Sequence, residues 1–306
     1  MMAERLDRRV GLVTGAAWPQ LDADDQLLQR ALVRRGVEAV PVIWTDPGWA
    51  TRGWSALVLR SCWDYPERIG PFRRWLSEVE RSRVPLWNPV ETVRWNLDKR
   101  YLMQLEGDGV PIVPTVYLDA GQGVNLPALL RDQGWEEAVI KPSISCGALR
   151  TRRVRRGEAA GAALALRDIL RQGAALVQCF LPELLSEGEL SFVFIEGALS
   201  HAVRLRPRPG DFRVQPTYGG TVERLTSPSP DLVQQARAVL RAATEWVDPP
   251  LYARVDGVVQ QGQLLLMELE LIEPRLYLRT DARAADRLAD ALLDRLGCGP
   301  RSRGTR

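Results

Sequence analysis

Three carboxylates interrupt an apolar segment near the end of this 306-residue chain. Glu268, Glu270 and Glu273 lie within QLLLMELELIEP, residues 263–274. Leucines surround them, as in a strand that belongs to a hydrophobic core. A buried carboxylate is costly unless a cation or several hydrogen-bond donors meet it. The segment therefore predicts a site where positive charge from the protein or from a ligand meets these acids.

The preceding segment, LYARVDGVV, supplies one cation and one more acid. If residues 261–263 form a three-residue loop centred on a glycine, the two segments pair as an antiparallel hairpin. Arg254 then faces Glu270, and Asp256 faces Glu268. Side chains alternate between the two faces of a strand, so all four share one face. We expect an acidic patch with one embedded arginine.

Opposed carboxylates in such a patch repel one another. At an effective dielectric constant of about 20, two unit charges 4 Å apart interact by about 4 kcal/mol. Oxygen ligands alone favour Mg²⁺ or Mn²⁺ over zinc, and His201 is the only histidine in the chain. The alternative is a ladder of salt bridges on a solvated face. The many leucines in both segments disfavour that alternative.

Lysine is rare in this sequence. Of 41 basic residues only Lys99 and Lys141 are lysines, and the others are arginines. A GC-rich coding bias explains such a ratio. That bias spares lysine mainly where a compact ammonium group is needed and the planar arginine fork fails. Both lysines are therefore candidates for functional roles.

The first third of the chain alternates strand and helix patterns. Strands are expected at 10–15, 37–44, 56–61 and 84–89, with helices at 24–36 and 71–82. This alternation predicts a mostly parallel sheet, whose ligands bind at the carboxyl ends of the strands. Arg60, Ser61, Trp63 and Asp64 follow one such strand. They are candidates for substrate contact, and the alternative is a turn whose tryptophan packs on the sheet.

The remaining elements change in character along the chain. The middle segment predicts helices near 96–109 and 158–172, strands at 114–118, 137–142 and 175–183, and a small-residue loop at 143–151. The last third predicts antiparallel strands, with a turn at Glu196-Gly197 and a strand over 221–226. A helix begins after Ser229 as N-cap with Pro230 in its first turn. A terminal helix is expected over 282–297.

The order of these features resembles the ATP-grasp superfamily, on the branch with glutathione synthetase, D-alanine–D-alanine ligase and the ribosomal-protein glutamate ligase. The resemblance covers most of the chain and is strongest over 96–274. It implies an α/β (α+β) fold. An N-terminal parallel α/β domain (1–95) would precede a central ATP-grasp subdomain (96–176) and a C-terminal subdomain with the metal site (177–306).

The resemblance implies roles for individual residues on the nucleotide. Lys99 and Lys141 match the two lysines that reach the phosphates, and residues 143–151, with Ser145 and Gly147, match the loop that covers them. The adenine hinge matches four consecutive residues, Gln178, Cys179, Phe180 and Leu181. Glu189 matches the acid on the ribose hydroxyls. Gln178 stands where an acid is frequent in the family.

The resemblance also implies the catalytic and metal residues. Arg254 matches an arginine on the transferred phosphoryl group. GDFRVQ places Arg213 near the acyl phosphate or substrate carboxylate, and Arg204 is expected to line the phosphates, whereas His201 is expected to be structural. The metal ligands match three acids, Asp256, Glu268 and Glu270. Glu270 stands where the family commonly has asparagine, and this extra charge bears on metal preference.

The implied function is an ATP-dependent, ADP-forming carboxylate–amine ligase. It would use Mg²⁺ (or Mn²⁺), form an acyl phosphate and act on a small amino-acid-like substrate. RSCWDY, KPSISCGA, GDFRVQ, YARVD and MELELIEP also resemble the ATP-grasp enzymes of cycloserine biosynthesis, which implies an intramolecular ligase that closes O-ureido-serine. Two alternatives are a catalytically silent nucleotide-binding regulator and a kinase that stops at phosphoryl transfer.

Composition disfavours several other classes of protein. No apolar run approaches the roughly 18 residues of a membrane span, and the chain begins with a charged segment, so we expect a cytoplasmic protein. The net charge of +3 and the lack of a basic face interleaved with aromatics do not favour nucleic-acid binding. The four cysteines are scattered, which disfavours a disulfide framework or a zinc site. Related ligases suggest a possible homodimer.

Overall fold

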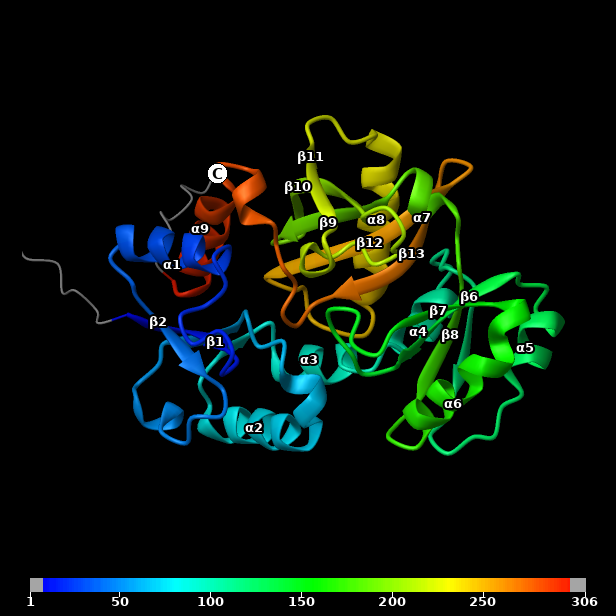
Figure 1. The fold of residues 1–306 in the computed structure, drawn as a ribbon. Helices are drawn as coiled ribbons and strands as arrows, with labels where there is room; N and C mark the ends of the chain where they lie inside the picture. The colour runs from blue at the N-terminus through cyan, green and yellow to red at the C-terminus, as the bar shows by residue number, and fades with distance from the viewer. Residues whose placement is uncertain (1–7, 298–306) are drawn as a thin grey trace, which may run out of the picture.

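The N-terminal layer is a parallel sheet, as the alternating sequence pattern predicts. The computed structural model describes residues 8–297. The strands run in the order β2-β1-β3-β4, with bounds β1 (Arg9–Thr14), β2 (Glu38–Ile43), β3 (Ala56–Leu59) and β4 (Leu86–Trp87). Helix α1 (Asp25–Arg34) covers one face and α2 (Ile69–Ser82) the other (Figure 1). The segments after β1 and β3 therefore emerge at the same edge of the sheet.

The central layer is a four-stranded antiparallel sheet. Its order is β5-β8-β6-β7, with bounds β5 (Thr115–Leu118), β6 (Glu137–Pro142), β7 (Arg152–Arg155) and β8 (Ala175–Cys179). Helices α5 (Leu126–Asp132) and α6 (Ala159–Leu170) pack on it around a core of leucine, isoleucine and alanine. Strand β7 was not expected from the sequence, and the predicted loop ends where it begins.

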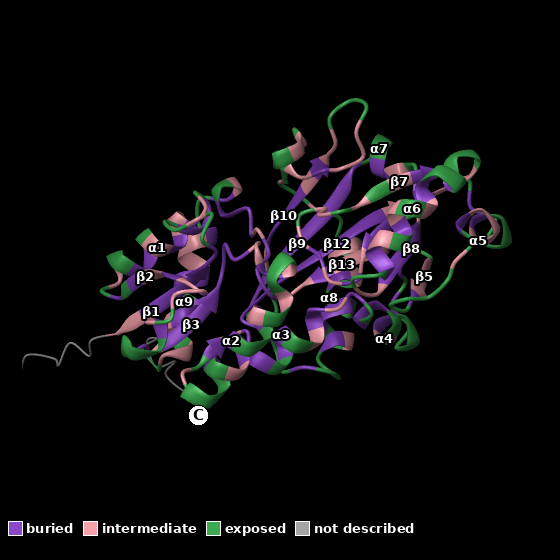
Figure 2. Ribbon diagram, turned by 60° about the horizontal axis from the view of Figure 1, so that its bottom comes forward, coloured by how far each residue is buried: buried purple, intermediate pink, exposed green. Residues whose placement is uncertain are grey.

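The third layer is the antiparallel sheet expected in the last third of the chain. Its order is β11-β10-β9-β12-β13, with bounds β9 (Glu189–Ile195), β10 (Ala198–Arg206), β11 (Thr221–Leu225), β12 (Tyr252–Gln260) and β13 (Gln263–Glu270). Helix α8 (Pro230–Ala243) begins after Ser229, as predicted, and buries its apolar face against this sheet. Figure 2 shows the strands buried and the outer helix faces exposed.

Several short elements complete the described chain. The helix expected near 96–109 is shorter, because the chain turns between α3 (Val90–Asn96), which lies before it, and α4 (Tyr101–Gly107). One further short helix is α7 (Glu183–Ser186). The 3₁₀ turns are η1 (Trp49–Thr51), η2 (Tyr65–Arg68), η3 (Arg156–Glu158), η4 (Pro216–Tyr218) and η5 (Leu278–Thr280). Among the described residues, no helix has the length and apolar character needed to cross a membrane.

The last described helix returns to the beginning of the chain. Helix α9 (Ala284–Arg295) lies beside α1, and Arg35, the C-cap of α1, pairs with Asp286 and Asp290 of α9. Leu288 and Leu292 join the core formed by the N-terminal sheet and the ends of β9 and β12. The division into three domains at residues 95 and 176 remains a prediction. The charged start of the chain and Cys298 lie outside the described residues.

The turn between β12 and β13 differs from the expected one. The loop contains two residues, Gln261 and Gly262, rather than three, and Gln260 pairs with Gln263. Both loop residues have positive φ, 52° and 81°. This conformation suits the right-handed twist of a tight two-residue hairpin, and glycine adopts it without steric cost.

A β-bulge restores the predicted register at the acidic patch. Between Asp256 and the next residue the pairing shifts by one, which leaves Met267 without a partner. Beyond this bulge Asp256 faces Glu268 and Arg254 faces Glu270, as predicted. Bulges are frequent next to active sites, where they re-aim side chains.

Candidate active site

A cavity of about 470 Å³ is lined by residues from all three layers. It collects every predicted nucleotide, catalytic and metal residue except Arg204: these are Lys99, Lys141, Ser145, Gly147, Gln178, Cys179, Phe180, Leu181, Glu189, Arg213, Arg254, Asp256, Glu268 and Glu270. Residues distant in sequence therefore converge on one space. Such a concave site with a few polar groups is typical of a small-molecule pocket.

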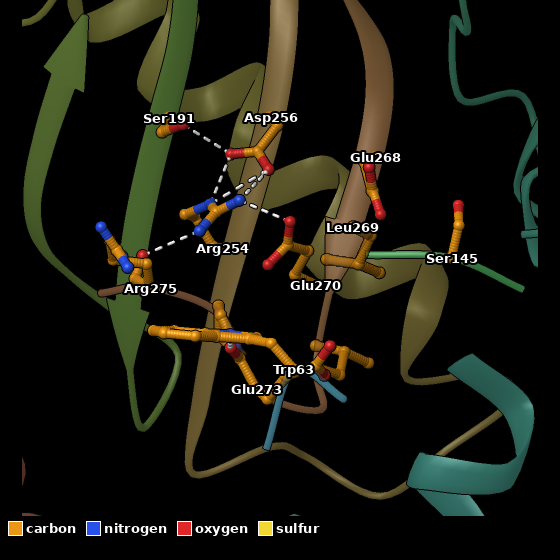
Figure 3. A network of polar contacts seen from close by, with 12 residues as sticks. Trp63, Ser145, Ser191, Arg254, Asp256, Glu268, Leu269, Glu270, Glu273 and Arg275 are labelled. Atoms are coloured by element: carbon orange, nitrogen blue, oxygen red, sulfur yellow. Dashed lines mark hydrogen bonds and ion pairs between the residues drawn. The ribbon is translucent and has the colours of Figure 1, made fainter. Parts of the chain in front are cut away.

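Arg254 holds the acidic patch together. Its Nε lies 2.9 and 3.0 Å from the two Asp256 carboxylate oxygens, and its Nη2 donates to Asp256 and to Glu270. Its Nη1 donates to the carbonyl of Arg275 at 2.8 Å, and Ser191 Oγ donates to Asp256 at 2.6 Å. Figure 3 shows this network on three adjacent strands. Every charged group in it is buried or half-buried, so the geometry of the arginine is fixed.

The patch still holds more negative than positive charge. Burial raises the pKa of Glu270 well above its ordinary value, despite Arg254, and neighbouring acids raise it further. Burial and then Asp256 raise the pKa of Glu189 to about 8. Carboxyl groups that resist ionisation in this way mark a place where an added cation is favoured. The protein alone does not neutralise this end of the cavity.

Lys99 forms an ion pair with Glu268. Its Nζ lies 3.0 Å from a Glu268 oxygen and also donates to the backbone carbonyl and hydroxyl of Ser145. Burial opposes the charge of Lys99, yet Glu268 raises its pKa. Conversely, burial would raise the pKa of Glu268, but Lys99 and then Lys141 lower it. This pair ties the loop after β6 to the acidic strand.

The donor set fits a hard divalent cation. Asp256, Glu268 and Glu270 offer only carboxylate oxygens, which Mg²⁺ and Mn²⁺ prefer. In the described part of the chain, no three His, Cys, Asp or Glu side chains converge on one point that would hold a metal. Arg254 and Lys99 contact these acids instead. The excess of carboxylates is the observation that fits a cation here.

The second lysine lies beside the predicted hinge. Lys141 Nζ lies 3.1 Å from Gln178 Oε1, and the amide nitrogen of Gln178 donates to Thr115 at 3.0 Å. Burial lowers the pKa of Lys141, which forms no ion pair in the described chain. The backbone amides of Cys179 and Phe180 donate to the carbonyls of Pro114, just before β5, and Glu137 of β6, so they are not free for a ligand.

Two loops close over the cavity. Cys146, in the loop after β6, donates its thiol to the carbonyl of Trp63 at 3.1 Å. The Tyr218 hydroxyl donates to the Gly147 carbonyl at 3.3 Å, and the Arg213 guanidinium lies 3.8 Å from the Tyr218 ring centroid. Arg213 also pairs with Asp211 at 2.8 Å, and this arginine lowers the pKa of Asp211. The predicted loop over the phosphates therefore contacts both neighbouring layers.

Comparison with known proteins identifies the family. Residues 10–88 match the model for the N-terminal domain of D-cycloserine synthetase DcsG. The chain is 32% identical, over 302 residues, to the cycloserine biosynthesis protein DcsG of Streptomyces lavendulae, covering 94% of this chain and 98% of that one. This chain belongs to the DcsG family of ATP-grasp ligases. It is accordingly an ATP-dependent, ADP-forming ligase, as the sequence predicted.

Solved structures agree on the ATP-grasp fold. The crystal structure of D-cycloserine synthetase DcsG matches with a TM-score of 0.82 at 30% identity and covers 94% of this chain and 99% of its own. D-alanine–D-alanine ligase from Bacillus anthracis in complex with ATP matches with a TM-score of 0.68 at 16% identity, covering 94% and 97%. The predicted fold class is confirmed.

In this DcsG-family chain Arg204 does not line the cavity. It lies on β10 opposite Leu190, whose side chain belongs to the core on the α8 side of the sheet. Its neighbours Val203 and Leu205 belong to the core on the cavity side. Side chains alternate along a strand, so Arg204 points away from the site that we predicted for it.

His201 has a structural environment, as expected. Its two ring nitrogens lie 2.9 Å from the Leu276 carbonyl and 3.0 Å from the Ser200 hydroxyl. Burial lowers its pKa to about 4. The neutral ring therefore links β10 to the segment that follows β13.

The RSCWDY segment divides between wall and core. Trp63 and Asp64 line the cavity, whereas Arg60 and Ser61 are fully buried outside it. Arg60 pairs with Asp25 at 2.8 Å, and the Ser61 hydroxyl donates to the same carboxylate at 2.6 Å. Sequence reasoning grouped the four residues, but only two of them can meet a ligand in this cavity.

Sequence reasoning missed the anchors of the acidic strand. Asn96 donates to the Leu269 carbonyl and accepts from the Leu271 amide, both at 2.8 Å. The Tyr101 hydroxyl donates to the Leu269 carbonyl and accepts from its amide, again at 2.8 Å. These side chains replace a neighbouring strand along the edge of β13. They flank Lys99 in NLDKRY, a proximity that was visible in the sequence.

Further cavity residues were given no specific role by the sequence analysis: Trp18, Glu67, Glu273, Arg275 and Tyr277. Trp18 and Glu67 follow strands of the parallel sheet, and their place after a strand was the only available signal. The other three lie directly after β13, where the apolar pattern ends. Glu273 stood out in the sequence as a third acid without an expected partner.

Proposed function

We propose that this ligase closes a ring within one amino-acid-like substrate, with O-ureido-serine as substrate and cycloserine as product. The similarity to cycloserine biosynthesis protein DcsG carries the proposal, because it spans nearly all of both chains. The matched N-terminal region supplies Trp18, Trp63 and Asp64 to one wall of the cavity. That wall is where a small substrate would be recognised.

The nucleotide is proposed to occupy the side of the cavity between the central and C-terminal layers. Lys99 and Lys141 would contact its phosphates, and the small residues Ser145 and Gly147 would cover them. Gln178 to Leu181 would hold the adenine, and Glu189 would accept from the ribose hydroxyls. Their common place in one cavity supports this assignment. The amides of Cys179 and Phe180 are engaged, which favours the Leu181 amide as the donor to adenine.

We also propose Asp256, Glu268 and Glu270 as the ligands of Mg²⁺ (or Mn²⁺). The raised pKa of Glu270, caused first by burial, supports a cation at this position. When bound, the ion would neutralise charge on the phosphate oxygens. Glu270, in place of the commonly found asparagine, adds a negative charge that favours a divalent cation.

The chemistry then needs no protein nucleophile. The substrate carboxylate attacks the γ-phosphorus of ATP and ADP leaves, which gives an acyl phosphate. The nitrogen of the substrate attacks the acyl carbon, phosphate leaves with the bonding electrons and the nitrogen loses a proton. Cycloserine carries no carbamoyl group, so that group is lost by hydrolysis in addition. Arg254 and Arg213 are proposed to stabilise the phosphoryl charge.

The test is ADP release from Mg-ATP with candidate substrates, added singly and in pairs. Release with O-ureido-serine alone, with cycloserine as the product by mass, supports the intramolecular ligase. Release only when a second amine is present identifies an ordinary amide-forming ligase instead. ATP binding without ADP release by O-ureido-serine would contradict the proposed substrate.

A further inference from the structure

The three acids of the QLLLMELELIEP segment differ in whether they form an ion pair. Glu268 pairs with Lys99, and Glu270 pairs with Arg254. Glu273 forms no ion pair with any described residue, although only 6% of it is exposed. Two more cavity acids, Asp64 and Glu67, likewise form no ion pair in residues 8–297. We call Asp64, Glu67 and Glu273 the acidic end of the cavity.

Glu273 is held in place by its neighbours. Its backbone carbonyl accepts from Trp63 Nε1 at 2.9 Å, which joins the segment after β13 to the N-terminal wall. In Figure 3 Trp63 and Glu273 lie together beyond Glu270. Burial raises the pKa of Glu273 to about 7, against the effects of Lys99 and of a hydrogen bond from Tyr65. A carboxylate this buried gains a great deal from a cation that enters the cavity.

Asp64 is also fixed. Trp44 Nε1 donates to its Oδ1 at 2.8 Å. Its carboxylate lies against the backbone of Gly15, where a Cβ would be 2.4 Å from Oδ1. A glycine is therefore needed for this side chain to lie where it does. Two carboxylates from different layers thus line one cavity, Asp64 held through its side chain and Glu273 through its backbone.

The surroundings of these acids suit an organic cation. Trp18 and Trp63 meet edge to face with ring centroids 5.0 Å apart, and both line the cavity. The Arg275 guanidinium lies 4.7 Å from the Trp63 ring centroid and is only half-buried. Aromatic walls attract alkylammonium groups but offer no ligands to a hydrated metal ion. Arg275 adds a positive group beside the acids, as the recognition of a zwitterion requires.

We propose that Glu273 and Asp64 bind the α-ammonium group of an amino-acid substrate, and that Arg275 and Arg254 attract its carboxylate. The proposal rests on the ligase function proposed above and assigns the part of the substrate that this end recognises. The ammonium at one end and the carboxylate at the other fix the orientation of the substrate toward the phosphates. N-acylated and des-amino acids are therefore poor ligands.

The test compares matched ligands that differ only in the amino group. Calorimetry measures the Kd of O-ureido-serine and of its des-amino counterpart, and of serine and 3-hydroxypropionate, with Mg²⁺ and a non-hydrolysable ATP analogue present. In the wild type each amine binds about 10- to 100-fold more tightly than its counterpart, as expected for a charged hydrogen bond. In Glu273→Gln the ratio falls to about 3 or less. The Kd of the ATP analogue stays unchanged in that variant and verifies its fold.

Glu245→Gln is the control, because Glu245 is an exposed carboxylate that does not line the cavity. It keeps the wild-type ratios. Equal affinity for amine and des-amino ligands, no binding of either amine, or a wild-type ratio in Glu273→Gln overturns the ammonium site. Glu273-dependent selection of serine without ADP release from O-ureido-serine keeps the ammonium site and overturns the proposed cyclisation.

Discussion

The two ends of the cavity differ in whether their acids have cationic partners in the protein. At the hairpin end, Arg254 and Lys99 meet three carboxylates, and most polar atoms there contact a protein partner. At the acidic end, Asp64, Glu67 and Glu273 form no ion pair within the described chain. The first arrangement organises the protein before any ligand arrives. The second leaves a charge whose partner, by our proposal, is the substrate itself.

The largest effects are expected from two buried arginines. One lies at the hairpin and the other lies behind the N-terminal wall, so their replacement compares a residue of the site with a structural one. Arg254 and Arg60 are both buried and both pair with an aspartate. Replacing either by methionine leaves a buried carboxylate without its partner, so we expect each variant to lose about 3–5 kcal/mol of unfolding free energy. Turnover of the folded fraction should fall at least about 10³-fold for Arg254→Met and by less than about 10-fold for Arg60→Met.

Urea titration and ADP release on the same samples measure these two effects. If Arg60→Met and Arg254→Met lose equal turnover, the distinction between a reacting and a structural arginine is wrong. Arg254→Lys serves as the matched variant, since it keeps the charge but not the fork geometry. It should recover stability more than activity.

The acidic end should carry a stability cost that depends on pH. The pKa of Glu273 is raised to about 7 from an ordinary value of 4.5, mainly by burial, with Glu268 adding to it and Lys99 and Tyr65 opposing it. The folded state therefore binds more protons than the unfolded state between these values, and stability falls as pH rises through this window. The loss from this group amounts to about 3 kcal/mol.

Glu273→Gln removes this titration. The unfolding free energy of the wild type should fall between pH 5 and pH 8 by up to about 3 kcal/mol more than that of the variant. The stability of the variant relative to the wild type should therefore rise over this range. Urea unfolding at both pH values measures this. If instead the stability of the variant relative to the wild type falls between pH 5 and pH 8, a cation of the protein already compensates the charge of Glu273.

These two regions also differ in what could be predicted from the sequence. The hairpin follows from local alternation and one turn, so its facing residues were predicted correctly. Yet the two-residue loop alone would put Asp256 opposite Met267, and only the bulge corrects it. The turn prediction was wrong by one residue, and an irregularity without any compositional signature offset that error.

Contacts between segments that are distant in the sequence could not be predicted from the sequence patterns. Glu273 meets Trp63 across 210 residues of chain, and Asn96 reaches Leu269 across 173. No periodicity encodes such proximity, because it depends on how whole layers pack. Arg204 failed for a different reason. The residue type was suitable, but its strand face was not, and face depends on a register that single residues do not reveal.

Lys141 tests the nucleotide side of the cavity. Its only side-chain hydrogen-bond partner among the described residues is Gln178, so Lys141→Ala should change unfolding free energy by less than about 1 kcal/mol. The Kd for ATP should rise about 10²-fold through loss of a charged contact to phosphate. Fluorescence titration with an ATP analogue gives the affinity, and Arg237→Ala, an exposed cation on α8, is the control. Unchanged affinity would remove Lys141 from the site.

The smallest expected effect concerns the side chains that position the acidic strand. Asn96 hydrogen-bonds the backbone on both sides of Glu270, so Asn96→Ala leaves the Leu269 carbonyl and the Leu271 amide without these partners. We expect a loss of about 2 kcal/mol in stability and about 10-fold in kcat, with a higher Mg²⁺ requirement, because the carboxylates are held less firmly. Asn125→Ala removes the N-cap of α5, away from the cavity, at a cost of about 1 kcal/mol. If both variants lose stability and neither changes its Mg²⁺ dependence, Asn96 supports the fold without positioning the site, and the hairpin organises its acids through Arg254 and Lys99 alone.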